Sequence, residues 1–346
     1  MDLFFETWHW FWAVLGCALN IALVYVAVFK TPKATRTYAT LIINFAVTDF
    51  LECALDWFIQ IRLIPAPGDV TMTYILNGAC KYISPFACKF GTSMFLHCIP
   101  HSVWSLLFSF GYRYYILHNA SLSRATLLKI LVIIYIPSLF QGLTYWTTFV
   151  PREEILPLAK IWFPNYDFES ETGVITGIVD VTSWAAAYGI CHLCLPIFPA
   201  YIVIFVFRRK IIKHLKENTQ MMAPETRAAH SQLLKALTLQ ACVPAFVGTA
   251  VIFYFISQSG LLISPFLEHA VFSSVILMPS LSPLTYLCFV RPYRQFFARV
   301  VRKYLLGGLG NGASKRAQSK TGKFDSEMVI DDDGDPRGND VAPMSD

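Results

Sequence analysis

The sequence predicts an all-α membrane protein, a bundle of seven transmembrane helices with an outside amino terminus and an amphipathic eighth helix on the inner surface. Composition is the first observation behind this fold class, because hydrophobic residues make up 55% of the 346 positions and charged residues only 15%. Soluble domains carry about 25% charged residues, so a bilayer is the expected solvent. The other two observations are seven long apolar stretches and a one-sided distribution of basic residues.

The seven apolar stretches are each long enough to cross a membrane. About 30 Å of hydrocarbon takes roughly 20 mostly apolar residues as a helix. The polar segment Ser257-Gln258-Ser259-Gly260 marks the turn between the last two. Together with the eighth helix, the spans form one membrane domain over residues 1–306. They run over residues 7–29, 38–61, 90–112, 130–149, 184–207, 236–256 and 266–289.

The Lys and Arg residues predict the orientation of these spans. None of the 28 lies inside a span, and with the amino terminus outside, 23 of them fall on the inner loops and tail. Because cytoplasmic loops carry an excess of basic residues, this orientation is favoured. The first span starts close to Met1 without a cleavage site, so we expect it to be retained. The sequon Asn119-Ala120-Ser121 then lies on an inner loop, out of reach of glycosylation.

Two further segments follow the seventh span. Residues 293–306 alternate aromatic and aliphatic residues with basic ones at helical spacing, which predicts an amphipathic helix along the inner membrane surface. After Gly307 the chain turns to Gly, Ser, Lys and Asp. Such a segment has too little apolar content to fold, so we expect residues 307–346 to be a disordered cytoplasmic tail.

The second span carries a row of polar residues that a bilayer disfavours. Asp49, Glu52, Asp56 and Gln60 follow one another at spacings of three, four and four, which puts them on one helix face. A charge at mid-depth costs about 2.5–3.5 kcal/mol, so this face must turn to the bundle interior. Asp49 lies near mid-depth and suits an ion or water network, whereas Asp56 lies near the outer end, within reach of a ligand. Protonated, hydrogen-bonded structural acids are the alternative interpretation.

The third span carries two histidines four residues apart, so His97 and His101 point the same way at the depth of an outer pocket. With Asp56 they are the candidate ligand-binding residues. A zinc site would need further ligands, which this helix does not space, and neutral hydrogen-bonded histidines are commoner. No metal-binding run, nucleophile elbow or phosphate loop occurs in the sequence. The sequence therefore predicts no metal, no cofactor, no catalysis and no nucleic-acid partner.

Five landmarks occur in order along the spans, namely Gly16-x3-Asn20, Asn44-Phe45-Ala46-Val47-Thr48-Asp49, Tyr112-Arg113-Tyr114, Pro244 and Ser282-Pro283-Leu284-Thr285-Tyr286. Taken together, they resemble the landmarks of rhodopsin-like receptors. The resemblance implies a ligand-driven switch whose residues meet a G protein, namely Arg113, Tyr114, Pro244, Pro283 and Tyr286, with Asn20 and Asp49 in an internal ion or water network. Three departures are clear, because Tyr112 replaces the acid that restrains the family's arginine, Ser282 replaces Asn, and the fourth span lacks the family's Trp.

Three further segments narrow the resemblance, namely Lys30-Thr31-Pro32-Lys33, Tyr112-Arg113-Tyr114-Tyr115-Ile116-Leu117, and the segment from Gln232 to Cys242. They resemble the nematode serpentine chemoreceptors of class delta, with the Str-type receptors as the nearest alternative class, and the resemblance covers about residues 10–305. It implies a plasma-membrane receptor, on sensory cilia, that couples an odorant or pheromone-like small molecule to a heterotrimeric G protein.

The resemblance also bears on a disulfide and on the competing function. Cys88 stands where rhodopsin-like receptors place the disulfide cysteine of the third helix, but the outer loop 150–183 has no cysteine. Cys80 or Cys191 is therefore the candidate partner. The alternative function is an ion channel or small-solute transporter that uses the acidic stripe of the second span. Seven spans without an inverted repeat argue against this alternative.

Overall fold

The computed structural model describes residues 1–31, 36–67, 69–217, 224–243 and 245–301. The chain divides into two units, Met1–Phe297 and Ala298–Asp346. The fold described below is that of the first unit. The predicted tail 307–346 and the last five residues of the predicted eighth helix lie outside the described residues.

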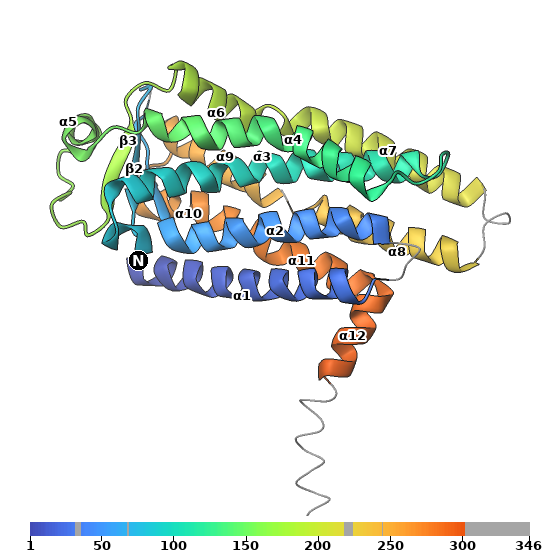
Figure 1. Ribbon diagram of the computed structural model, residues 1–346. Helices are drawn as coiled ribbons and strands as arrows, with labels where there is room; N and C mark the ends of the chain where they lie inside the picture. The colour runs from blue at the N-terminus through green and yellow to red at the C-terminus, as the bar shows by residue number, and fades with distance from the viewer. Residues whose placement is uncertain (32–35, 68, 218–223, 244, 302–346) are drawn as a thin grey trace, which may run out of the picture. The chain divides into compact units, whose positions relative to one another are not determined.

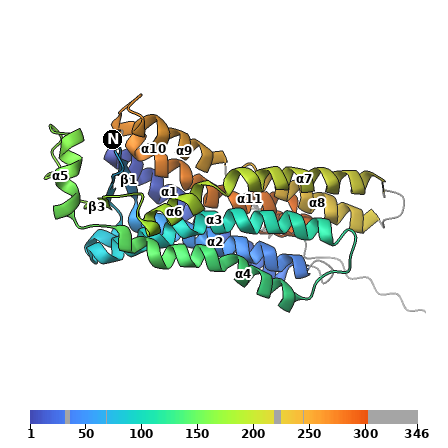
Figure 2. The same ribbon diagram turned by 90° about the horizontal axis from the view of Figure 1, so that it is seen from above.

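Helices occupy all seven predicted spans, and they lie side by side along one direction (Figures 1 and 2). Four spans are single helices and three are pairs of helices. The single helices are α1 (Asp2–Phe29), α2 (Arg36–Ile59), α3 (Pro85–Tyr115) and α4 (Arg124–Thr144); the pairs are α6 (Trp184–Cys194) with α7 (Ile197–Glu217), α8 (Pro224–Gln240) with α9 (Ala245–Gln258), and α10 (Pro265–Val275) with α11 (Leu277–Phe289).

The prediction of a seven-helix membrane bundle is confirmed. In the part of the chain that the structure describes, six helical stretches are long and apolar enough to cross a membrane, and α3 completes the bundle. This helix is more polar because it packs against α2, α4, α6 and α7, so its histidines, serines and threonines face protein. The fifth span extends ten residues beyond its predicted end, as α7 continues to Glu217.

Prolines account for some of the helix interruptions. Pro196 lies between α6 and α7. A proline removes one backbone N–H and leaves the carbonyl four residues earlier without its helical partner. Pro100, Pro137 and Pro283 nevertheless sit inside helices, where neighbouring groups must satisfy such carbonyls. Pro244, the predicted hinge of the sixth span, lies outside the described residues, between the end of α8 and the start of α9.

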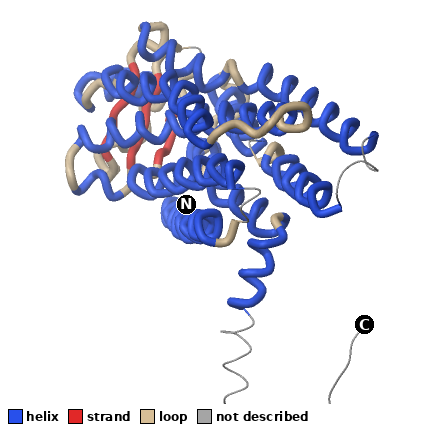
Figure 3. Tube along the Cα trace, turned by 45° about the vertical axis from the view of Figure 1, so that its right-hand side comes forward, coloured by secondary structure: helices blue, strands red, loops and turns tan. Residues whose placement is uncertain are grey.

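A three-stranded antiparallel sheet lies at the outer end of the bundle, which the sequence analysis did not predict (Figure 3). Its strands are β1 (Ile61–Ile64), β2 (Met72–Leu76) and β3 (Val174–Ile178), in that order. The short helix α5 (Arg152–Trp162) packs on β3. A disulfide between Cys80 and Cys88, with Cα atoms 5.0 Å apart, joins the 3-10 turn η2 (Ala79–Tyr82) to the start of α3. The outer loops are therefore an ordered cap.

The predicted eighth helix is present as α12 (Arg291–Val301), which starts two residues earlier than expected. Tyr293 is buried, and its hydroxyl lies 2.7 Å from the Thr31 hydroxyl at the end of the first span. The ammonium of Lys30 lies 5.3 Å from the centre of the Phe296 ring. These contacts hold the start of α12 against the inner end of α1.

Candidate functional site

Asp56, a predicted ligand residue, is buried at the outer end of α2 and takes part in a chain of hydrogen bonds. His9 Nδ1 of α1 lies 2.7 Å from Asp56 Oδ2, and His9 Nε2 lies 3.0 Å from Ser273 Oγ of α10. With Asp56 ionised, Nδ1–H donates to the carboxylate and Nε2 accepts from the Ser273 hydroxyl. This chain ties three helices together. The sequence analysis missed His9, although a histidine within an apolar span was a usable signal.

A cavity of about 230 Å3 opens beside this chain of hydrogen bonds. Its walls come from the first turns of α1, the residues just after α2 and just after β2, the loop before β3 and the start of α10. His9 lines the cavity, so Asp56 lies one side chain behind its wall. Most of the lining is polar or charged, including Asp2, Gln60 and His269.

An ion-pair network closes one side of this cavity. Arg62 of β1 donates to Glu268 Oε2 through Nε at 2.9 Å and Nη2 at 2.7 Å, and to Glu171 Oε1 through Nη1 at 2.9 Å. Burial alone lowers the pKa of Arg62, but Glu268 and the other neighbours raise it above its ordinary value. Burial and a hydrogen bond to Glu171 raise the pKa of Tyr166 to about 12. Arg62 therefore stays charged, and its hydrogen bonds to Glu268 join the sheet to α10.

The acidic face of α2 turns inward, as its spacing predicts. Asp49 and Glu52 are both buried, and neither Glu52 oxygen has a hydrogen-bond partner among the described residues. A cavity of about 10 Å3 lies beside Asp49 and is also lined by Ser102 and Ser282. This is roughly the volume that a single water molecule needs, at about 10–15 Å3 of probe-occupied space. The geometry suits a small water or ion network.

Asn20, predicted to belong to the same network, donates two hydrogen bonds to backbone carbonyls. Its Nδ2 donates to Gly16 O at 2.9 Å and to Pro279 O of α11 at 3.1 Å. Pro279 O is the carbonyl that Pro283, four residues later, leaves without a helical donor. Asn20 therefore repairs the break that Pro283 makes in α11.

His97 and His101 share one face of α3, as predicted, and that face packs toward α4. His97 Nε2 lies 3.0 Å from the Tyr135 hydroxyl, and the His101 ring centre lies 4.8 Å from that of Tyr135. His101 Nε2 is also 3.4 Å from Asn44 Oδ1 of α2. His101 lines a groove of about 360 Å3 between α2 and α4. Within the described ranges, no group of three or more His, Cys, Asp or Glu side chains is placed to hold a metal ion.

Two of the predicted switch residues, Arg113 and Tyr286, lie at the inner end. Arg113 of α3 is buried, and its guanidinium carbon lies 4.2 Å from the centre of the Tyr38 ring, a cation–π distance. Tyr286 of α11 donates to Gln240 Oε1 of α8 at 2.6 Å, and Gln240 Nε2 donates to Ser282 Oγ at 3.3 Å. The ring of Tyr38 therefore lies next to Arg113. The adjacent position, where the resemblance to rhodopsin-like receptors would place an acid, is occupied by Tyr112. A hydrogen-bonded pair ties the sixth and seventh spans.

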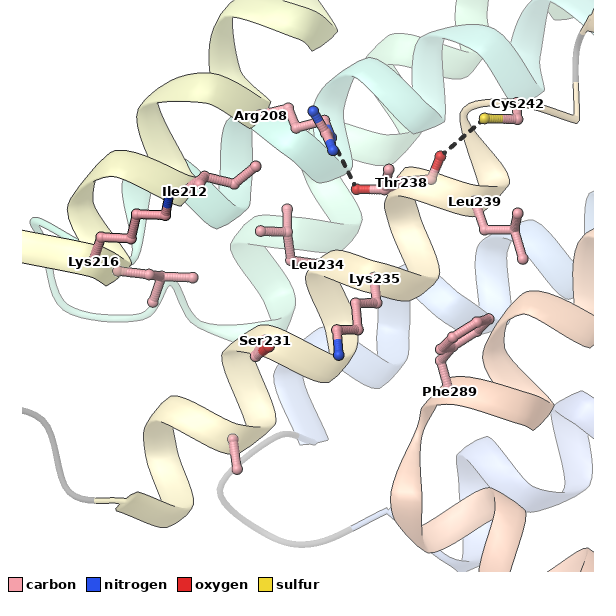
Figure 4. A pocket seen from close by; sticks show the side chains of 12 residues that line it. Arg208, Ile212, Lys216, Ser231, Leu234, Lys235, Thr238, Leu239, Cys242 and Phe289 are labelled. Carbon is pink, nitrogen blue, oxygen red and sulfur yellow. Dashed lines mark hydrogen bonds between the residues drawn. The ribbon is translucent and has the colours of Figure 1, made fainter. Parts of the chain in front are cut away.

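A larger cavity of about 750 Å3 opens at the inner end between α7, α8 and the end of α11 (Figure 4). Its floor is apolar, with Leu234, Leu239 and Phe289, and its rim carries Arg208, Lys216 and Lys235. Arg208 Nε donates to Thr238 Oγ1 across the cavity at 3.2 Å. Tyr114, the remaining predicted switch residue, packs on Phe207 of α7 with Lys210 Nζ 5.4 Å from its ring centre.

Comparison with known proteins agrees with this architecture. Squid rhodopsin superposes with a TM-score of 0.60 at 12% identity, covering 93% of this chain and 91% of its own. Serpentine receptor class delta-19 of Caenorhabditis elegans is 61% identical over 324 residues, 94% of this chain and 95% of its own length. Class delta-18 of the same organism is 62% identical over 301 residues, 87% of this chain and 89% of its own. Residues 5–299 match the family described as serpentine type 7TM GPCR chemoreceptor Srd, and the chain therefore belongs to that family.

Proposed function

We propose that this chain is a chemosensory receptor of the plasma membrane that binds a small molecule at its outer end and activates a heterotrimeric G protein at its inner end. The observation that carries the proposal is the pairing of two cavities in one rhodopsin-like bundle. A polar cavity lies at the outer end, and a basic-rimmed cavity lies at the inner end beside the Arg113 and Tyr286 cluster. A sensory cilium is the proposed site of action.

The proposed ligand-responsive residues are Asp56, His97 and His101. Asp56 responds through His9, because any ligand that moves the His9 ring changes the hydrogen bonds joining α1, α2 and α10. His97 and His101 join α3 to α4 and α2 through Tyr135 and Asn44. A ligand acts on such contacts only if it binds one arrangement of the helices more tightly than another.

At the inner end, activation requires the hydrogen bond between Tyr286 of α11 and Gln240 of α8 to break. The bond from Tyr286 to Gln240 holds the two helices together, and Pro283 weakens the backbone of α11 one turn away. Pro244 is the proposed hinge of the sixth span, and Asn20 and Asp49 are the proposed internal network. Separation of the inner ends would widen the basic-rimmed cavity for a G-protein segment.

Ligand-dependent nucleotide exchange on a purified G protein, with the receptor in lipid nanodiscs, tests this proposal. Arg113→Ala should abolish exchange, because it removes the buried cation from the inner cluster, while leaving surface expression intact. Arg124→Ala is the matched control, since Arg124 is exposed at the start of α4. Full exchange by Arg113→Ala would contradict the assigned role of this residue.

The alternative of a channel or transporter needs a continuous polar path along the acidic face of α2. The cavity beside Asp49 measures only about 10 Å3, and Asp56 is engaged by His9. Packing of this kind favours the receptor. Ion flux through protein-containing liposomes without a G protein would reverse that preference.

A further inference from the structure

The outer cavity is rich in negative charge. Glu6 is an exposed residue of α1 that lines it, and its carboxylate makes no hydrogen bond or ion pair with any other described residue, whereas Asp2 Oδ1 lies 3.1 Å from His269 Nε2. Carboxylates that line the cavity or lie one contact behind its wall outnumber the cationic side chains there. They are Asp2, Glu6, Asp56, Glu171 and Glu268, against Arg62 and Lys81.

A second and independent feature of this cavity is an unsatisfied amide. Gln60 lines the cavity and is only 6% exposed, yet its side chain has no hydrogen-bond partner in the described part of the chain. Its backbone is fully engaged, because its N–H donates to Asp56 O at 2.8 Å and its carbonyl accepts from Asn77 N at 3.1 Å. Its side-chain amide nitrogen and oxygen are not among the fully enclosed unpaired atoms of the described residues, so they open onto the cavity, where a bound molecule can reach them.

The structure assigns the outer cavity to a small organic cation, a primary amine, as the ligand class of the proposed receptor on which this inference rests. The ammonium would donate to the Glu6 carboxylate and to Gln60 Oε1, while Phe5 and Ile61 contact its hydrocarbon part. A volume of about 230 Å3 limits the ligand to a small molecule. An organic cation fits better than a metal ion, because no metal-holding group of side chains exists among the described residues.

Three probes that share one carbon skeleton test the charge preference. The purified full-length receptor in nanodiscs, without any G protein, is titrated with 3-methylbutylamine, 3-methylbutanol and 3-methylbutanoate. We expect saturable binding of the amine, at least tenfold tighter than binding of the alcohol, and the weakest binding by the acid. Equal binding of amine and alcohol, or no binding of the amine at millimolar concentration, overturns the inference.

Two variants test the residues, and one serves as a control. Glu6→Gln should weaken amine binding at least tenfold without weakening alcohol binding. Gln60 has φ +41°, a left-handed conformation that glycine adopts readily, so Gln60→Gly should keep or raise the melting temperature and still weaken amine binding. Glu153→Gln changes an exposed carboxylate of α5 away from the cavity and should leave binding unchanged. Unchanged amine affinity in both cavity variants overturns the inference.

Failure of this inference and failure of the proposed function are distinguishable. If the receptor stimulates nucleotide exchange with other ligands but binds no amine, the amine inference is contradicted and the proposed function stands. Amine binding that depends on Glu6 and Gln60, together with no exchange under any condition, supports the inference and contradicts the coupling.

Discussion

A single side chain in this bundle can supply a hydrogen bond that a proline has removed from a neighbouring helix. Asn20 donates to Pro279 O, which Pro283 leaves without its helical N–H. Asn20→Ala would leave this buried carbonyl unsatisfied, at a cost of about 1–3 kcal/mol, so we expect a lower melting temperature of the purified receptor. Asn119→Ala is the control, because Asn119 is exposed and bonds only within its own turn. Equal melting temperatures for the two variants would contradict the repair role.

The hydroxyl of Tyr286 is a second single-residue tie, between α11 and α8. Tyr286→Phe removes the 2.6 Å bond to Gln240 Oε1 and keeps the ring. A neutral hydrogen bond contributes about 0.5–1.5 kcal/mol, which corresponds to a change of about two- to tenfold in a two-state equilibrium. We expect basal nucleotide exchange to rise by that factor, because the inner ends separate more easily. Tyr25→Phe, at an exposed position of α1, should change nothing. Lower exchange in Tyr286→Phe would show that the bond stabilises the active arrangement instead.

The polar face of α2 could be predicted residue by residue, whereas its partners could not. The spacing along one helix shows that Asp49, Glu52 and Asp56 share a face. The free-energy cost of exposing charged side chains to lipid predicts that this face is buried in the bundle, as the structure shows. That Asp56 meets His9 depends on how α1 and α2 are rotated against each other, which no single-helix pattern contains. The same limit applies to His97, whose helix face was predicted but whose neighbour Tyr135 was not.

Among elements, the outer sheet depends on one arginine that joins it to α10. The Arg62 and Glu268 side chains are each 5% exposed, and removal of one partner from a buried ion pair costs about 3–5 kcal/mol. Arg152 and Glu169 form a matched exposed pair, 37% and 67% accessible, of the kind that contributes about 0–1 kcal/mol. We expect Arg62→Gln to lower the melting temperature strongly and Arg152→Gln to leave it nearly unchanged. Similar shifts in the two variants would mean that the Arg62 network does not hold the sheet.

The elements that sequence reasoning predicts best are those that one segment specifies alone. A span needs about 20 apolar residues in a row, and that property is visible without knowing any neighbour. The strands are four or five residues long, and β2 pairs with β3 about a hundred positions later. Such short runs give little periodic signal, so the sheet was missed. The helix break at Pro196 in the fifth span was missed because proline within a membrane helix does not always end it.

At the scale of the whole molecule, the bundle is asymmetric from one end to the other. The sheet lies at the end of the bundle that carries Met1 (Figure 2). The disulfide and the acidic cavity belong to the same end, and the basic-rimmed cavity lies at the opposite end, between α7 and α8. Basic residues predicted this polarity from sequence. The site at each end needed the structure, because each cavity combines residues from at least three separate segments.

An odd number of spans requires the two ends of the chain to face opposite sides of the membrane. An epitope tag before Met1 should bind antibody on intact cells, and a tag after Asp346 should bind only after permeabilisation. Glycan mapping gives an independent measurement, because Asp167→Ser completes a sequon at Asn165, an exposed residue of the outer loop. This variant should gain one glycan, since the enzyme that attaches it works on the outer side. The native sequon at Asn119, equally exposed but on the inner loop, should stay bare and serves as the matched control. A glycan at Asn119, or both tags accessible from the same side, would contradict the orientation on which both proposed sites depend.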